Sequence, residues 1–344
     1  MTGTAQRLLS PEEIAVRAGE QVPYLRLPAI GSVFAEREMR LRQLAAGHAM
    51  RDYLLFVAEL CRAQHEACGG AKAAAATAEE IEAASRAGTA PFDVAGADRD
   101  PAWRDTLRAL LRRVEPRLAV GPARAQVARV AAMDDAALEA LADRIVRGVA
   151  LGLDVAAAPL VAAGLQAHLA ARVAATAVAH AEARLAPFGR TDDDRLCPCC
   201  GSRPVASVTR IGGDEGGYRY LACSLCATQW HMVRIKCAHC RSTKGITYQS
   251  LDLSDAAPAG GTGGRAVAGA TSSGRAVELE CCGECGHYLK IVHMERDPEV
   301  EPVADDLATL TLDLLADEAG EARHGANPLL VFGESGDPPE AGAG

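Results

Sequence analysis

Aromatic side chains are scarce in this chain of 344 residues: phenylalanine, tyrosine and tryptophan make up 4% of it, although hydrophobic residues make up 49%. Alanine accounts for much of the difference, and this mixture favours alanine-rich helices over a large β-sandwich. An excess of positive charge is also missing, since the net charge is −9. The chain as a whole is therefore a poor general ligand for nucleic acid or anionic membranes, although a local basic patch stays possible.

Segments typical of export or membrane insertion are missing too. Residues 1–20 carry acidic side chains and lack the apolar core of a signal peptide. The most apolar stretch, residues 149–165, contains Asp154 and is too short and too weakly hydrophobic to predict a transmembrane helix. We therefore expect a soluble cytoplasmic protein that has no membrane partner. In a reducing cytoplasm, clustered cysteines bind metal or carry out redox chemistry more often than they form structural disulfides.

Catalytic motifs are the third absence. The sequence holds no phosphate-binding loop of the form GxxxxGKS or GxxxxGKT, no dinucleotide fingerprint between a strand and a helix, and no HExxH motif. Its acidic pairs are spread along predicted helix faces, where solvated charge explains them. We predict no catalytic residues, no organic cofactor and no enzymatic activity.

The character of the sequence changes near residue 188. Residues 1–188 carry helical periodicity, whereas ten of the twelve cysteines and most short β-like segments follow. We therefore predict an α+β fold, with a mostly α-helical N-terminal domain followed by two small four-cysteine metal modules of the rubredoxin or zinc-ribbon type. The predicted extents are 189–235 for the first module, 236–300 for the second with a mobile loop at 254–274, 301–320 for a C-terminal helix, and 333–344 for a disordered tail.

Three of the predicted helices carry specific expectations. Residues 71–86 predict a helix with a weak pattern. A helix after Asp154 is expected to run to Leu185 with a break near Gly164, because glycine weakens the interior of a helix. Residues 305–316 predict a single amphipathic helix.

Four Cys-x-x-Cys pairs carry the strongest signal in the sequence. Two intervening residues make a tight turn in which both sulfurs face one ion, and two such turns supply a tetrahedral site for zinc or iron. Gly201 and Gly286 follow the first and last pairs, where the turn often requires a positive φ. Pairing in sequence order predicts two sites, the first from Cys197, Cys200, Cys223 and Cys226 and the second from Cys237, Cys240, Cys282 and Cys285.

Other readings of these residues stay open or are disfavoured. An interleaved pairing of the four turns stays open, whereas disulfides would need an exported chain and a thioredoxin-type pair would need a βαβ context. Cys199 and Cys281 are interpreted as free neighbours, because each set already has four sulfurs, and exposed reactive thiols stay open as an alternative. Cys61 and Cys68 are interpreted as small buried side chains. A surface or core position is favoured over metal ligation for His231, His239, His287 and His293.

Three cysteine-rich stretches resemble the FdhE family, the accessory proteins for formation of active formate dehydrogenase. They are CPCCGSRPVASV (197–208), RYLACSLCATQWHMVRIKCAHC (219–240) and ECCGECGHYLKIVHMERDPEVEPVADDLATLTLDLL (280–315). The stretch SVFAEREMRLRQLAAGHAMRDYLLFVAEL (32–60) is similar as well. The segment TQWHMVRIKC makes the resemblance specific, because generic zinc ribbons share the cysteine turns but not this segment.

The resemblance implies a helical region followed by two rubredoxin-like modules in which the eight paired cysteines are the metal ligands. It also implies a cytoplasmic maturation chaperone that binds the catalytic, molybdenum-containing subunit of formate dehydrogenase before export and is not a dehydrogenase itself. Iron has been associated with the family. Because thiolate tetrahedra accept iron and zinc alike, we expect up to two ions of either metal per chain.

Two other functions compete with this one. A nucleic-acid-binding zinc ribbon usually presents a basic face, yet residues 189–299 hold 13 lysines and arginines against 13 aspartates and glutamates. This balance disfavours nucleic acid as a partner. A rubredoxin-like electron-transfer protein ranks lower as well, because a bare carrier does not need so large a helical domain. Neither the surface that meets the client nor the oligomeric state follows from the sequence.

Overall fold

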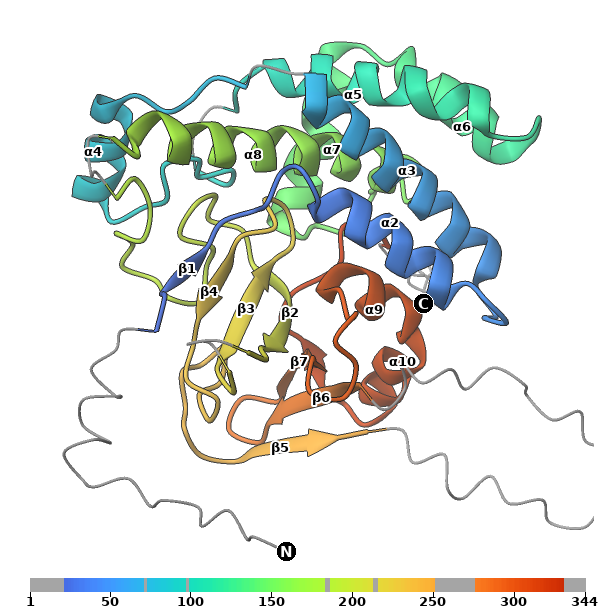
Figure 1. Cartoon of the computed structure of the whole chain (residues 1–344). Coiled ribbons are helices and arrows are strands. Elements are labelled where there is room, and N and C mark those ends of the chain that lie inside the picture. Colours follow the sequence, from blue (N-terminus) through green and yellow to red (C-terminus); the bar gives the residue numbers. More distant parts are fainter. Residues whose placement is uncertain are drawn as a thin grey trace, which may run out of the picture.

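The computed structural model describes residues 22–70, 73–96, 99–182, 186–212, 216–250 and 276–330. Figure 1 shows a layer of helices from the N-terminal half lying across one end of a β-sheet, with two more helices from the C-terminal part beside the sheet. The predicted combination of a helical N-terminal region with β-rich cysteine modules is confirmed. The predicted mobile loop at 254–274 and the predicted disordered tail at 333–344 lie outside the described residues.

Capping residues explain where several helices of the upper layer begin and end. These helices are α2 (Val33–Leu44), α3 (Arg51–Gly70), α4 (Ala78–Ala87), α5 (Ala102–Val114), α6 (Pro122–Ala131), α7 (Asp135–Arg147) and α8 (Ala158–His180). Thr77 and Glu80 form a reciprocal capping box, so the helix predicted over 71–86 begins only after Thr77. Asp134 caps α7, and Gly148 ends that helix in a left-handed conformation with a φ of 67°.

Helix α8 is the buried centre of this layer. It runs unbroken through Gly164, so the predicted break at that residue is wrong. A Cβ added to Gly164 would lie 2.7 Å from the Cβ of Leu107 on α5, so the glycine is there to let two helices approach closely. Among the described helices, α8 alone is long and apolar enough to cross a membrane, but 72% of its apolar window is buried inside the protein. The apolar side chains of α8 therefore form part of the protein core.

Replacing Gly164 with alanine is expected to destabilise the protein by about 1–3 kcal/mol, because the added methyl group would overlap Leu107 and push α5 away from α8. By helix propensity alone, the change to alanine would stabilise the protein by up to about 1 kcal/mol. Urea unfolding measures the difference. Gly69→Ala in α3 is the control, because nothing lies within 4 Å of a Cβ added there. A Gly164→Ala protein as stable as this control would contradict the argument from close packing.

Eight strands in the described part of the chain form one sheet in the order β1-β4-β3-β2-β7-β6-β5, with β8 pairing with β7. They are β1 (Leu25–Arg26), β2 (Pro204–Thr209), β3 (Arg219–Cys223), β4 (Gln229–His231), β5 (Ile246–Gln249), β6 (Val277–Cys282), β7 (His287–His293) and β8 (Ala322–Arg323). Strands β2 to β4 and β5 to β7 make two antiparallel units, one for each cysteine group. The units join where β2 and β7 pair in parallel, with Ser207 opposite Ile291. The two modules are therefore halves of one continuous sheet.

The helical layer and the first half of the sheet share a hydrophobic core. One cluster of buried side chains extends from Leu41 and Trp103 in the helices to Cys197, Cys223 and Trp230 in the sheet. Strand β1, which precedes all the helices of the layer, also pairs with β4 at the edge of the sheet. The division of the chain into domains stays a prediction, but the helical layer and the first module bury each other's apolar surfaces.

The C-terminal helix predicted over residues 301–320 is two helices, α9 (Pro302–Ala308) and α10 (Leu310–Glu318). They meet at Thr309, whose backbone leaves the helical region and whose hydroxyl donates to the carbonyl oxygen of Asp305 at 2.8 Å. Arg40 of α2 donates to both carboxylate oxygens of Asp305, at 2.9 and 2.6 Å. This pair is buried and fastens α9 to the helical layer.

Candidate metal centres

The first group of four sulfurs lies between the turn that precedes β2 and the turn that follows β3. Cys197 and Cys200 come from the earlier turn, and Cys223 and Cys226 from the later one. The Sγ atoms of Cys197 and Cys226 lie 3.5 Å apart, and those of Cys200 and Cys223 lie 3.4 Å apart. Each of the four residues is at most 2% exposed. We call this group the first centre.

The second centre consists of Cys237, Cys240, Cys282 and Cys285, from the turn before β5 and the turn between β6 and β7. The Sγ atoms of Cys237 and Cys285 lie 3.8 Å apart, and those of Cys240 and Cys282 lie 3.7 Å apart. Cys240 is exposed and Cys285 is half-buried. The two centres therefore have similar geometry but differ in their access to solvent.

Both centres have the dimensions of a tetrahedral thiolate site. In each group the four Sγ atoms lie within 4.8 Å of one another, and all eight cysteines are free thiols. A metal–sulfur distance of about 2.3 Å gives sulfur–sulfur separations of about 3.8 Å in a tetrahedron. The second centre matches this value and the first is a few tenths of an ångström tighter. The donor sets therefore fit zinc or iron, and metal ligation by these residues stays a prediction.

A shared backbone conformation explains why the sulfurs of each pair converge. The residue after the second cysteine has a positive φ in all four turns, at Gly201, Ala227, Arg241 and Gly286. Backbone N–H groups then point at sulfur, as where Leu225 and Cys226 donate to the Sγ of Cys223 at 3.3 and 3.2 Å. In the sequence, glycine at 201 and 286 indicated the positive φ of two of these turns. Alanine and arginine concealed it at the other two, because L-residues rarely adopt a left-handed conformation.

Two hydroxyl groups support the first centre. The Oγ atom of Ser202 lies 3.1 Å from the Sγ of Cys200 and 3.0 Å from that of Cys223. The Oγ1 atom of Thr228 lies 3.2 Å from the Sγ of Cys226. Hydrogen bonds of this kind orient thiolate ligands and tune their basicity. The sequence carried no signal for either residue, because serine and threonine are common throughout the chain.

The structure brings the cysteine pairs together in sequence order and not in the interleaved arrangement. Cys199 and Cys281 are buried but belong to neither centre, and burial raises the pKa of Cys281 to about 11. Cys61 is buried and Cys68 is half-buried on α3, and burial raises the pKa of both thiols to about 12. The thiols of Cys61, Cys68 and Cys281 are therefore protonated at neutral pH and poorly reactive.

The four histidines of the cysteine-rich region fall into two groups. His231 packs edge-on against Tyr218 and Tyr220 at one end of the sheet, and the Nε2 of His293 lies 2.9 Å from a carboxylate oxygen of Glu278. His239 and His287 instead lie beside the second centre, where their rings stack with 3.7 Å between centroids. Sequence reasoning missed a third histidine there, His324, whose ring meets that of His239 edge-on. It comes from residues after β8, and nothing in the local sequence indicates that position.

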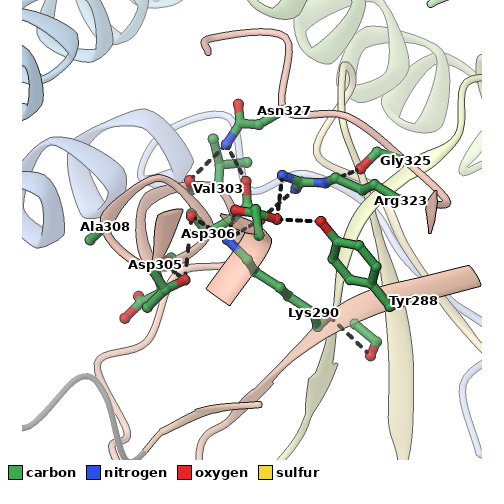
Figure 2. A network of polar contacts seen from close by, with 12 residues as sticks. Tyr288, Lys290, Val303, Asp305, Asp306, Ala308, Arg323, Gly325 and Asn327 are labelled. Atoms are coloured by element: carbon green, nitrogen blue, oxygen red, sulfur yellow. Dashed lines mark hydrogen bonds and ion pairs between the residues drawn. The ribbon is translucent and has the colours of Figure 1, made fainter. Parts of the chain in front are cut away.

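A buried network of charged side chains lies where β7 meets the two C-terminal helices (Figure 2). Lys290 is fully buried, and its Nζ lies 2.5 Å from a carboxylate oxygen of Asp313 and donates to the carbonyl oxygen of Asp306 at 2.9 Å. Arg323 pairs with the carboxylates of both aspartates, at 2.5 and 3.0 Å. The hydroxyl of Tyr288 donates to a carboxylate oxygen of Asp313 at 2.8 Å. Two cations thus balance two carboxylates in the interior.

A cavity of about 520 Å³ lies between the segment that joins α7 to α8, the turns of the first centre and the C-terminal residues. Apolar side chains that include Val149, Leu225 and Leu314 line part of it. Arg147 and Arg203 also line it, and each donates to a backbone carbonyl oxygen at 3.5 Å. Within the described part of the chain, no carboxylate pairs with either guanidinium group. We call this cavity the cleft.

Taken together, the fold and the two centres define a class of protein: a helical region joined to two zinc-ribbon-like cysteine modules. Three family models match the chain in order, namely the N-terminal domain of FdhE over residues 22–186, its central domain over 196–234 and its C-terminal domain over 235–330. The chain belongs to the FdhE family.

Individual relatives agree with this assignment. A protein described as an FdhE homolog from Klebsiella pneumoniae is 34% identical over 318 residues, which is 92% of this chain and 94% of the relative. An FdhE homolog from Edwardsiella ictaluri is 37% identical over 314 residues, or 90% of this chain and 92% of the relative. The crystal structure of the FdhE protein from Pseudomonas aeruginosa superposes with a TM-score of 0.73 at 32% identity and covers 90% of this chain and all of that one.

Proposed function

We propose that this protein is a cytoplasmic accessory protein that binds the catalytic subunit of formate dehydrogenase and is needed for formation of the active enzyme. The observation that carries the proposal is that the family match includes the helical layer and both cysteine centres, in the family's order. Co-purification of the catalytic subunit from the host with the tagged chain tests it. Retention of the subunit by the tagged chain supports the proposal, and its absence under conditions where both proteins are present overturns it.

Each centre offers four thiolates, which complete the tetrahedral coordination of one metal ion. A catalytic zinc site instead keeps one position for water or substrate. We therefore assign the two centres structural or electron-handling roles, with iron or zinc bound by all eight cysteines, and assign the chain no enzymatic activity.

Electron transfer is the second candidate, and the exposure of the second centre favours it. Cys240 is exposed, so an iron ion held there would lie close to solvent and within reach of a redox partner. Metal analysis and a visible spectrum of protein purified without oxygen distinguish the two roles. Iron with thiolate absorption bands that bleach on reduction supports electron transfer. Two zinc ions and a colourless protein leave only the structural role.

The cleft is our candidate for the surface that receives the client. Two acidic residues line the cleft, and Lys290 and Arg323 already neutralise one of them, Asp313. Asp317 is then the one remaining negative charge in the lining, whereas three arginines besides Arg323 line the same cleft: Arg144, which is half-buried, Arg147 and Arg203. This excess of positive charge beside apolar side chains complements a client segment that carries acidic and apolar residues. A client segment rich in basic residues would instead be repelled, because Arg147 and Arg203 are not paired with carboxylates in the described part of the chain.

The double substitution Arg147→Glu and Arg203→Glu is expected to weaken client binding by about tenfold or more, because it places like charges opposite the acidic segment. Biolayer interferometry with the catalytic subunit at two salt concentrations measures the effect, which shrinks as salt rises. The matched control is Arg112→Glu with Arg113→Glu on α5, which makes the same change in net charge away from the cleft. Equal binding by the two variants would remove the cleft from the proposal and leave the accessory function intact.

A further inference from the structure

Beside the second centre lies a second group of side chains that could hold a metal ion, and its two imidazoles have no role in the proposed function. The ring nitrogens of His239 and His287 and the Sγ of Cys285 lie within 4.8 Å of one another. His239 sits inside the third Cys-x-x-Cys turn, and His287 follows the fourth by two residues. Because the second centre joins these turns, it also brings the two imidazoles into contact, with an angle of 8° between the ring planes.

An independent observation at this place is the third histidine. His324 is 5% exposed, and neither of its ring nitrogens has a hydrogen-bond partner in the part of the chain that the structure describes. The Nδ1 of His239 is also buried and without a partner there. Leaving a buried polar atom unpaired costs about 1–3 kcal/mol, so native proteins supply such atoms with water or an ion.

A small cavity touches the histidines of this group, although Cys285 does not line it. A cavity of about 10 Å³ is lined by the three histidines together with Cys237 and Cys282 of the second centre. Arg219 and Glu280 also line it and neutralise each other across 2.8 Å. A volume of this order holds a single water or ion. Two imidazoles and a thiolate are donors for zinc and its neighbours among the divalent metals, and not for magnesium or calcium.

We propose that His239, His287 and Cys285 bind a divalent cation of the zinc class next to the second centre, with His324 lining the cavity beside them. Cys285 belongs to this group and to the second centre, so the inference rests on the metal-binding part of the proposed function. The shared thiolate makes the histidine group a loading site. An ion held by the imidazoles reaches the second centre by exchanging one ligand at a time, with each new metal–sulfur bond replacing one metal–nitrogen bond and no change of oxidation state.

The test uses the full chain after metal removal by a chelator under reducing conditions. Cobalt(II) is titrated into the wild type and into the double variant His239→Asn, His287→Asn, with visible absorption as the readout. We expect three equivalents in the wild type, the third of them weaker and with mixed nitrogen and sulfur ligation. We expect the double variant to retain two equivalents, to bind the third about tenfold or more weakly, and to fill the second centre more slowly. The control is His65→Asn with His231→Asn, which removes two histidines that lie outside the group.

Each outcome decides the matter. Two equivalents and equal loading rates in the wild type, the double variant and the control overturn the inference and leave the two cysteine centres standing. Failure of the cysteine centres to take up cobalt in any protein counts against the proposed function instead. Should the double variant not fold, X-ray absorption at the zinc edge of wild-type protein loaded with three equivalents supplies the answer. Nitrogen scatterers support the site, and sulfur alone overturns it.

Discussion

A chain with Cys223 replaced by serine is expected to bind no metal at the first centre and to fail to fold stably. All four sulfurs of that centre are buried, and they form part of the hydrophobic cluster that the helical layer shares with the sheet. Structural metal sites contribute on the order of 10 kcal/mol to folding, which is comparable with the whole stability of a domain. Loss of this term leaves three thiols and three hydroxyls, those of Ser202, Thr228 and the introduced serine, in a buried core. Soluble yield, metal content and thermal unfolding measure the result.

Two controls make this prediction specific. Cys281→Ala removes a buried cysteine that belongs to neither centre, and it is expected to cost no more than about 1–2 kcal/mol. Cys240→Ser removes an exposed thiol of the second centre, so the protein is expected to remain folded and to bind less metal. If Cys223→Ser unfolds no more readily than Cys281→Ala, the first centre does not stabilise the fold.

Replacing Lys290 with methionine is expected to destabilise the protein by about 3–5 kcal/mol, because the change removes a fully buried cation from a set of two cations and two carboxylates in which Arg323 is partly exposed. Asp306 and Asp313 would then share Arg323 alone, with an uncompensated negative charge in the interior. A loss of this size lowers the melting temperature by roughly 10 °C in a chain of this length. Calorimetry or urea unfolding measures it.

The matched control for Lys290→Met is Lys236→Met. The Nζ of Lys236 lies 2.6 Å from a carboxylate oxygen of Asp194, but both side chains are partly exposed, so the expected cost is below about 1 kcal/mol. Adding Asp313→Asn to Lys290→Met restores the charge balance and is expected to recover part of the loss. Equal destabilisation by Lys290→Met and Lys236→Met would mean that the network contributes nothing beyond a surface pair.

The network also has a consequence for the proposed client surface. Asp313 and Arg323 line the cleft and belong to the network, and α10 carries Leu314 into the same cleft. The buried pairs that hold β7, β8 and α10 together therefore also set the position of one wall of the cleft. A Lys290→Met protein that still folds is expected to bind the client more weakly than the wild type.

The helices show how far local patterns predict the fold. The capping box at Thr77 is a local signal that the helix predicted over 71–86 did not use, and α4 begins only after it; α7 likewise ends at the glycine that follows Arg147. Helix α6 was not predicted, because its stretch of alanine and arginine has few large apolar residues beyond Val127 and Val130. The expected break at Gly164 was wrong for a different reason. Glycine weakens an isolated helix, but here it allows the close approach of α5, which no local pattern records.

The sequence by itself determined the chemistry of the two centres. A Cys-x-x-Cys turn is local, so its spacing is enough to predict that two thiols face one ion, and four such turns predict two sites of four sulfurs. The change from helical to β-like patterns near residue 188 likewise follows from side chains a few positions apart, and so does the resemblance to FdhE.

Only the tertiary structure decided what depends on contacts between residues far apart in the chain. It paired the cysteine turns in sequence order, joined the two modules through β2 and β7, and buried the first centre while leaving the second exposed. It also placed His324 beside His239, and Arg323 beside Lys290 with its aspartates. Each of these depends on how strands and helices pack, because the partner of a side chain across a sheet or a core is set by the path of the whole chain and not by its neighbours in sequence.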